Sequence, residues 1–164
     1  MKLPLVTITF IALALVSAQD QQASGVRGGG VGRNSSGQVA EIKVRFANVK
    51  REEKVLVFGE LEFATTNRTT KTRYAVRVSP RDNRKPVRGT LSINGNTATF
   101  EGAGSLLVSV NGRQERIEGV VRAQLIDRGE TNDAFAITFT KNGRTESFEG
   151  KLDKGNITVQ GPQA

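Results

Sequence analysis

Beyond the first 37 residues, apolar and polar side chains alternate with a period of two, and this pattern constrains the fold more than any other feature of the chain. Ile42, Val44 and Phe46 alternate with basic residues, and segments 73–79 and 135–139 repeat the alternation. Successive side chains of a β-strand point to opposite faces, so this spacing is typical of strands with one buried face. No window of eleven residues carries the 3.6-residue period of an amphipathic helix. The sequence therefore predicts an all-β fold.

Asparagine-glycine pairs mark several connections between the predicted strands. They separate strand-like segments at Asn94-Gly95, Asn111-Gly112 and Asn142-Gly143. This pair favours the left-handed backbone of a type I′ hairpin turn. Residues 153–155, Asp-Lys-Gly, predict a further hairpin.

About nine or ten antiparallel strands follow from the alternation and the turns together. Strands at this spacing fit a single-domain antiparallel β-sandwich, with a closed β-barrel as the alternative. The predicted strands cover residues 39–49, 54–65, 71–79, 87–93, 97–102, 105–110, 114–126, 134–140, 144–151 and 156–160.

The N-terminal residues 1–18 have the order of a secretory signal peptide. One positive charge precedes an apolar run over residues 5–16, and small residues lead to a cleavage site expected after Ala18. The run is shorter than the roughly 20 residues that a membrane-spanning helix needs. The mature protein is therefore expected to be secreted, in a periplasmic or extracellular location.

Residues 19–37 are rich in glycine, serine and glutamine, which predicts a flexible leader ahead of the folded domain. A short edge strand around Gly30 is the alternative. The single all-β domain is then expected to span residues 38–164.

The chain contains neither cysteine nor histidine. Disulfides, thiol nucleophiles, histidine-dependent triads and the usual zinc sites are therefore excluded. Carboxylate chemistry, oxygen-liganded cations such as calcium, and noncatalytic binding remain open.

Positive charge is concentrated in residues 68–88. This segment holds eight basic residues and one acid, Asp82, whereas the whole chain has a net charge of +8 from 24 basic and 16 acidic residues. If the apolar residues of segment 73–79 face the core, Arg73 and Arg77 project from the other face. The candidate polyanion-binding residues are Lys71, Arg73, Arg77, Arg81, Arg84, Lys85 and Arg88.

Two interpretations of this basic segment remain open. It would bind an anionic polymer such as envelope polysaccharide, lipopolysaccharide or extracellular nucleic acid through charge pairing. Alternatively, its charges and prolines protect an exposed edge strand from pairing with other chains. Sequence-specific recognition of nucleic acid is not expected, because the chain has no tryptophan and only one tyrosine, and no groove-reading helix is predicted.

Two groups of acidic residues are further candidate sites. Calcium accepts oxygen ligands from a flexible loop, and such ligands are offered by Asp127, Glu130, Asn132 and Asp133. The same residue types also populate ordinary turns, where their side chains bond the local backbone. Glu60 and Glu62 have a spacing that a carboxylate-based glycoside hydrolase could use, although outward charges on many strands have it too.

The region from Asn94 to Val159 resembles a known family. Its segments NGNTATFEGAG (94–104), VNGR (110–113), LIDRGETNDAFAITF (125–139) and FEGKLDKGNITV (148–159) occur in the order found in the secreted bacterial post-COAP domain. The resemblance covers about residues 94–159. It implies a β-rich secreted module and offers no catalytic residues.

The sequence as a whole predicts a secreted noncatalytic binding or scaffold module with a basic surface for anionic polymers and no cofactor. A calcium-stabilised extracellular adhesion or assembly domain is the first alternative, and a carboxylate-based hydrolase is the second.

Overall fold

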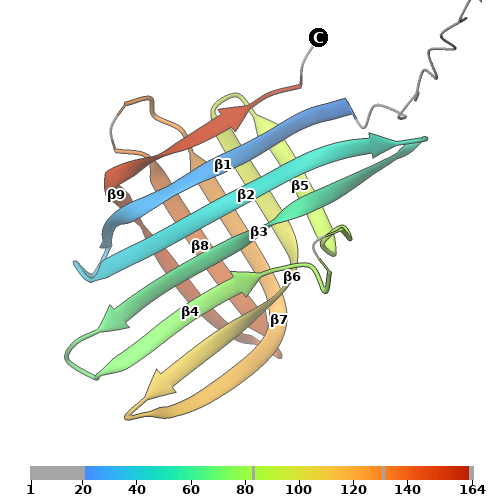
Figure 1. The fold of residues 1–164 in the computed structure, drawn as a ribbon. Coiled ribbons are helices and arrows are strands. Elements are labelled where there is room, and N and C mark those ends of the chain that lie inside the picture. The colour runs from blue at the N-terminus through green and yellow to red at the C-terminus, as the bar shows by residue number, and fades with distance from the viewer. Residues whose placement is uncertain (1–20, 83, 131, 163–164) are drawn as a thin grey trace, which may run out of the picture.

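The computed structural model describes residues 21–82, 84–130 and 132–162, apart from the side chains of residues 21–23. These residues form nine antiparallel strands and no helix (Figure 1). The strands are β1 (Gln21–Asn34), β2 (Val39–Arg51), β3 (Lys54–Asn67), β4 (Thr72–Val78), β5 (Gly89–Asn94), β6 (Thr97–Val110), β7 (Arg113–Ile126), β8 (Ala134–Lys141) and β9 (Arg144–Gln160). The predicted all-β antiparallel fold is confirmed.

The strands belong to one sheet that folds over into two layers, as the predicted sandwich requires. Hydrogen-bonded neighbours follow the order β4-β3-β2-β1-β9-β8-β7-β6-β5, and β4 also pairs with β6. Strands β1 to β4 run across the front of Figure 1, while β5 and β8 lie behind them. The long strands β6, β7 and β9 bend and contribute to both layers (Figure 1). The hydrogen bonding is therefore continuous from one layer to the other.

The core lies between the two layers and consists of the inward-facing residues of the alternating strands. Phe46 and Phe100 stack with their ring centroids 4.4 Å apart. The ring centroid of Phe63 lies 5.6 Å from that of Phe135 and 5.2 Å from that of Phe148. Burial of such side chains stabilises the fold without disulfides. The described residues include no helix long and apolar enough to cross a membrane.

Two of the predicted Asn-Gly turns are confirmed by backbone geometry, and one is shifted. At both Asn111-Gly112 and Asn142-Gly143, the two residues have positive φ, as a type I′ turn requires. At the third pair only Gly95 has positive φ, because β5 continues through Asn94 and the turn comprises residues 95 and 96.

The predicted hairpin at residues 153–155 is wrong. These residues lie within β9, which combines the predicted strands 144–151 and 156–160. The pairing with β1 shifts register here, since Val31 pairs with Lys154 and Gly32 pairs with Leu152. The Asp-Lys-Gly sequence therefore accompanies a β-bulge, which also uses turn-like residues. The predicted strands 97–102 and 105–110 are likewise one strand, β6.

The predicted flexible leader is also wrong over residues 21–34, which form β1. This strand is central, because it pairs with β2 along one edge and with β9 along the other. Its glycines permit close approach of the neighbouring backbone: a Cβ added at Gly30 would lie 2.0 Å from the carbonyl oxygen of Lys154. The predicted signal peptide, residues 1–18, lies outside the described residues.

A candidate binding site formed by basic residues

Strand β4 carries Arg73 and Arg77 on the outer surface, as the alternation predicts. Val76 and Val78 are buried in the core, whereas Arg73 and Arg77, at alternate positions of the opposite face, are exposed. β4 pairs with β3 along one edge and with β6 along the other. It is therefore not an edge strand, and edge protection does not explain its two arginines.

The loop between β4 and β5 is folded against the domain by backbone contacts. Val87 is buried in the core, and its N–H donates to the carbonyl oxygen of Val57 at 2.8 Å. The carbonyl oxygen of Arg88 accepts a hydrogen bond of 2.8 Å from the N–H of Ala103. Asp82, the one acid of the basic segment, accepts from the N–H of Arg84 at 3.0 Å. This loop is therefore anchored at its β5 end, next to β6.

A hollow of about 680 Å³ opens where β6 changes its partner from β4 to β5. The change occurs at Ala103 and Gly104, which both line the hollow. We call this feature the basic hollow. Five cationic side chains line it, namely Arg77, Arg81, Lys85, Arg88 and Arg116, together with one carboxylate, Glu118.

Ion pairing neutralises only part of this charge. Arg116 pairs with Glu118 at 2.8 Å, and Arg77 pairs with Glu62 at 3.0 Å. Among the described residues, no ion pair involves the three loop cations that line the hollow, Arg81, Lys85 and Arg88. Since exposed ion pairs contribute only about 0–1 kcal/mol, both paired arginines can also exchange their partners for a ligand.

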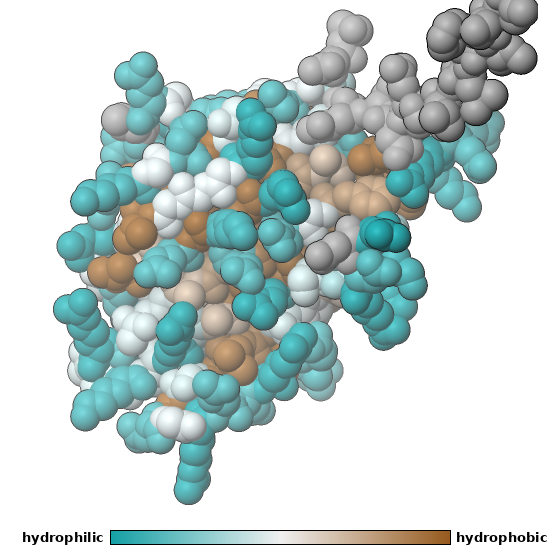
Figure 2. All heavy atoms as spheres, viewed as in Figure 1, coloured by the Kyte–Doolittle hydropathy of each residue, from teal (hydrophilic) through white to brown (hydrophobic). Residues whose placement is uncertain are grey.

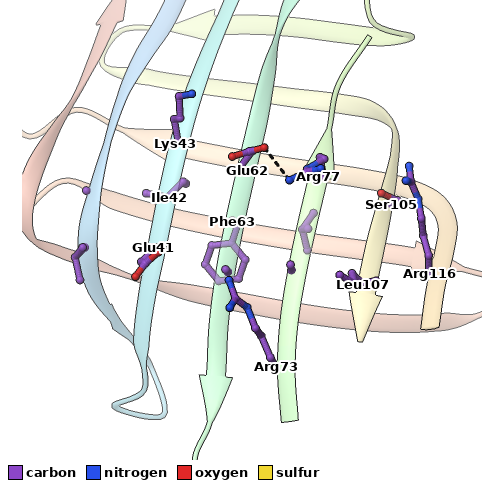
Figure 3. Close-up of a pocket in the computed structure, with 15 residues that line it drawn as sticks. Glu41, Ile42, Lys43, Glu62, Phe63, Arg73, Arg77, Ser105, Leu107 and Arg116 are labelled. Atoms are coloured by element: carbon purple, nitrogen blue, oxygen red, sulfur yellow. Dashed lines mark ion pairs between the residues drawn. The ribbon is translucent and has the colours of Figure 1, made fainter. Parts of the chain in front are cut away.

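A second depression of about 520 Å³ lies beside the basic hollow on the outer face of β2, β3, β4 and β6 (Figure 3). We call it the strand groove. It shares Arg77, Ser105 and Arg116 with the basic hollow and adds Arg73 and Lys43. Figure 3 shows the charged side chains of Arg73, Arg77 and Lys43 among its lining residues. Figure 2 shows hydrophilic side chains interspersed with paler and apolar residues on the face of β1 to β4.

The structure brings together most of the predicted polyanion-binding residues, but not all of them. The basic hollow contains Arg77, Arg81, Lys85 and Arg88, and the strand groove contains Arg73. Two others line neither depression: Lys71 lies in the turn before β4, and Arg84 lies on the exposed side of the loop.

Sequence reasoning missed Arg116, which belongs to β7. The Asn111-Gly112 hairpin determines which residue of β6 lies opposite Arg116. Because Val110 pairs with Arg113, the residue opposite Arg116 is Leu107. What the sequence did not indicate is the pairing of β6 with β4, and that pairing brings Arg116 beside Arg77.

The carboxylates of Asp127 and Asp133 accept hydrogen bonds from the backbone of β9. Asp133 Oδ2 accepts from the N–H of Ile157 at 2.6 Å, and Asp127 Oδ2 accepts from the N–H of Val159 at 3.1 Å. Strand β8 begins only at Ala134, so this part of β9 has no strand neighbour on that side. The two aspartates satisfy backbone donors that would otherwise lack partners.

The other two residues of the predicted calcium site lie in the same loop. Glu130 is exposed, and Asn132 has a φ of 64°. Within the described part of the chain, no group of three or more Asp or Glu side chains has the arrangement of a metal site. Calcium binding by this loop stays a prediction.

The two carboxylates considered for hydrolysis each face a cation on a neighbouring strand. Glu60 pairs with Lys43 at 3.6 Å, and Glu62 pairs with Arg77 at 3.0 Å. Both ion pairs run across strands on the outer face, which is the usual arrangement of opposite charges on a sheet surface.

Comparison with known proteins returns no matching family model, no matching curated protein and no matching solved structure. The resemblance to the post-COAP domain therefore stays a prediction.

Proposed function

We propose that the protein is a secreted, noncatalytic module that binds anionic polymers through the basic hollow. The observation that carries this proposal is the gathering of five cationic side chains from β4, the following loop and β7 around one depression with a single carboxylate. Charge of one sign in a concave surface attracts a polyanion from a distance and pairs with its anionic groups.

The position of β4 within the sheet further supports a binding role. Edge protection would account for a basic strand that has a free edge, but β4 is paired along both edges. The only described strand next to the basic loop with a single strand neighbour is β5. Its outer edge is partly covered, since Asn48 Nδ2 donates to the carbonyl oxygen of Leu91 at 3.0 Å.

Removing two loop cations is expected to weaken binding to a polyanion. The double variant Arg81→Gln, Lys85→Gln should bind immobilised heparin about 5- to 30-fold more weakly, because each basic side chain near a polyanion contributes roughly 1 kcal/mol. Affinity can be measured by surface plasmon resonance at about 0.1 M salt, where charge pairing still acts over roughly 10 Å.

The matched control is Lys141→Gln, Lys151→Gln, which removes the same charge from exposed positions on β8 and β9. Neither lysine lines the basic hollow or the strand groove. The control should retain nearly the wild-type affinity. Equal losses in the two double variants would mean that net charge, and not the basic hollow, determines binding.

Replacing the carboxylate that holds Arg77 is expected to strengthen binding. Glu62→Gln removes the partner of the 3.0 Å ion pair and leaves Arg77 free for the polymer. Affinity for heparin should rise about two- to fivefold, because an exposed ion pair that no longer competes for Arg77 contributes up to about 1 kcal/mol. A gain cannot arise from misfolding, so unchanged or weaker binding would count against a role for Arg77.

A further inference from the structure

The basic hollow and the strand groove are parts of one continuous depression. They share Arg77, Ser105 and Arg116, so no ridge of other residues separates them at these positions. The loop cations lie at one end, and Arg73 lies on β4 beyond Arg77, in the strand groove. The depression therefore extends along β4.

The length of this depression exceeds the reach of a single anionic group. Arg73 and Arg77 are four residues apart on the same face of β4, which places their Cα atoms about 13 Å apart at the rise of an extended strand. The basic hollow adds further cations beyond Arg77. A ligand that contacts both ends must carry anionic groups along an extended chain.

Positive charge falls from one end of the depression to the other. The basic hollow has five cations and one carboxylate, whereas the strand groove includes two carboxylates, Glu41 and Glu62, beside its cations. An anionic chain would therefore be held most strongly in the basic hollow, with Arg73 as a second, more distant contact.

The lining residues also favour one kind of polymer. The basic hollow has no aromatic residue in its described lining, and the only aromatic residue of the strand groove, Phe63, has its side chain buried in the core. Single-stranded nucleic acid is usually held by stacking its bases on exposed aromatic rings. An anionic polysaccharide can be bound by charge pairing and by a hydroxyl group such as that of the exposed Ser79.

We propose that the depression binds a linear anionic polysaccharide along β4, anchored in the basic hollow and contacted again at Arg73. This proposal rests on the proposed function and adds the class of polymer, its direction along the strand and a two-point mode of attachment. Linking two contacts through one chain makes the second contact intramolecular, so affinity depends on whether the chain spans both.

Heparin oligosaccharides of increasing length test the two-point attachment, with binding measured by calorimetry on the full mature protein. Affinity should rise steeply with length until the chain reaches Arg73 and only slowly thereafter. Arg73→Gln should weaken the longest oligosaccharides about fivefold, the effect of one basic contact, and leave the shortest unchanged. Arg88→Gln, in the basic hollow, should weaken every length.

The outcomes separate this proposal from the proposed function. If no oligosaccharide or heparin binds at low salt, the proposed function itself is wrong. If heparin binds but Arg73→Gln weakens all lengths equally, or none, the two-point attachment is wrong. If single-stranded DNA of equal charge binds as tightly as the longest oligosaccharide, the assignment to polysaccharide is overturned.

Discussion

Asp133→Ala is expected to lower the free energy of unfolding by about 3–5 kcal/mol, because it removes two hydrogen bonds to a charged acceptor and leaves one buried and one partly buried donor unpaired. Asp133 is 2% exposed. Its carboxylate accepts from the N–H groups of Ile157 at 2.6 Å and Arg128 at 2.7 Å. The side chain thus takes the place of a strand neighbour for β9 and fixes the loop before β8. Urea denaturation followed by circular dichroism measures the effect.

Asp153→Ala is the matched control, since Asp153 is exposed and forms a surface ion pair with Arg33 at 3.6 Å. Its effect should stay below about 1 kcal/mol. Similar midpoints for the two variants would contradict the structural role of Asp133. Repeating the wild-type denaturation with added calcium tests the alternative use of the same carboxylates, because a bound ion would raise the midpoint.

Gly30→Ala is expected to destabilise the fold by at least about 3 kcal/mol or to prevent folding, since a well-packed site cannot absorb an added methyl without displacing backbone. The new Cβ would lie 2.0 Å from the carbonyl oxygen of Lys154 and 2.9 Å from the Cα of Gly155. Both contacts are with the backbone of β9, so the central pairing of β1 with β9 would have to open. Thermal unfolding and the yield of folded protein measure the effect.

Gly161→Ala serves as the control for this substitution. A Cβ at Gly161 meets no atom within 4 Å. The free energy of unfolding of this variant should therefore lie within about 0.5 kcal/mol of the wild-type value. If Gly30→Ala were equally neutral, β1 would not be packed against β9 as closely as the structure shows, and the flexible leader predicted from composition would regain support.

Local patterns predicted the strands well, because they depend on neighbours in sequence. Alternation placed β2, β4 and β8 close to their observed positions, and the two type I′ turns follow because Asn111 and Asn142 tolerate the left-handed backbone that such a turn requires. The burial of Val76 and the exposure of Arg73 and Arg77 follow from the same alternation.

The errors arose where a distant strand determines the role of a residue. The glycines of β1 predicted flexibility because their close contact with β9, 120 or more residues away, is not visible in the local sequence. For the same reason, turn-like residues 153–155 predicted a hairpin in place of a bulge. Within the candidate site, the contribution of Arg116 depends on the pairing of β4 with β6, which no turn motif indicates.

The salt dependence of heparin binding tests the central claim most directly. For the wild type, the logarithm of the association constant should fall linearly with the logarithm of salt concentration. The triple variant Arg81→Gln, Lys85→Gln, Arg88→Gln should lower the magnitude of that slope by about three, roughly one for each lost contact. Identical slopes for the variant and the wild type, or no binding by the wild type at about 50 mM salt, would contradict the basic hollow as the binding site.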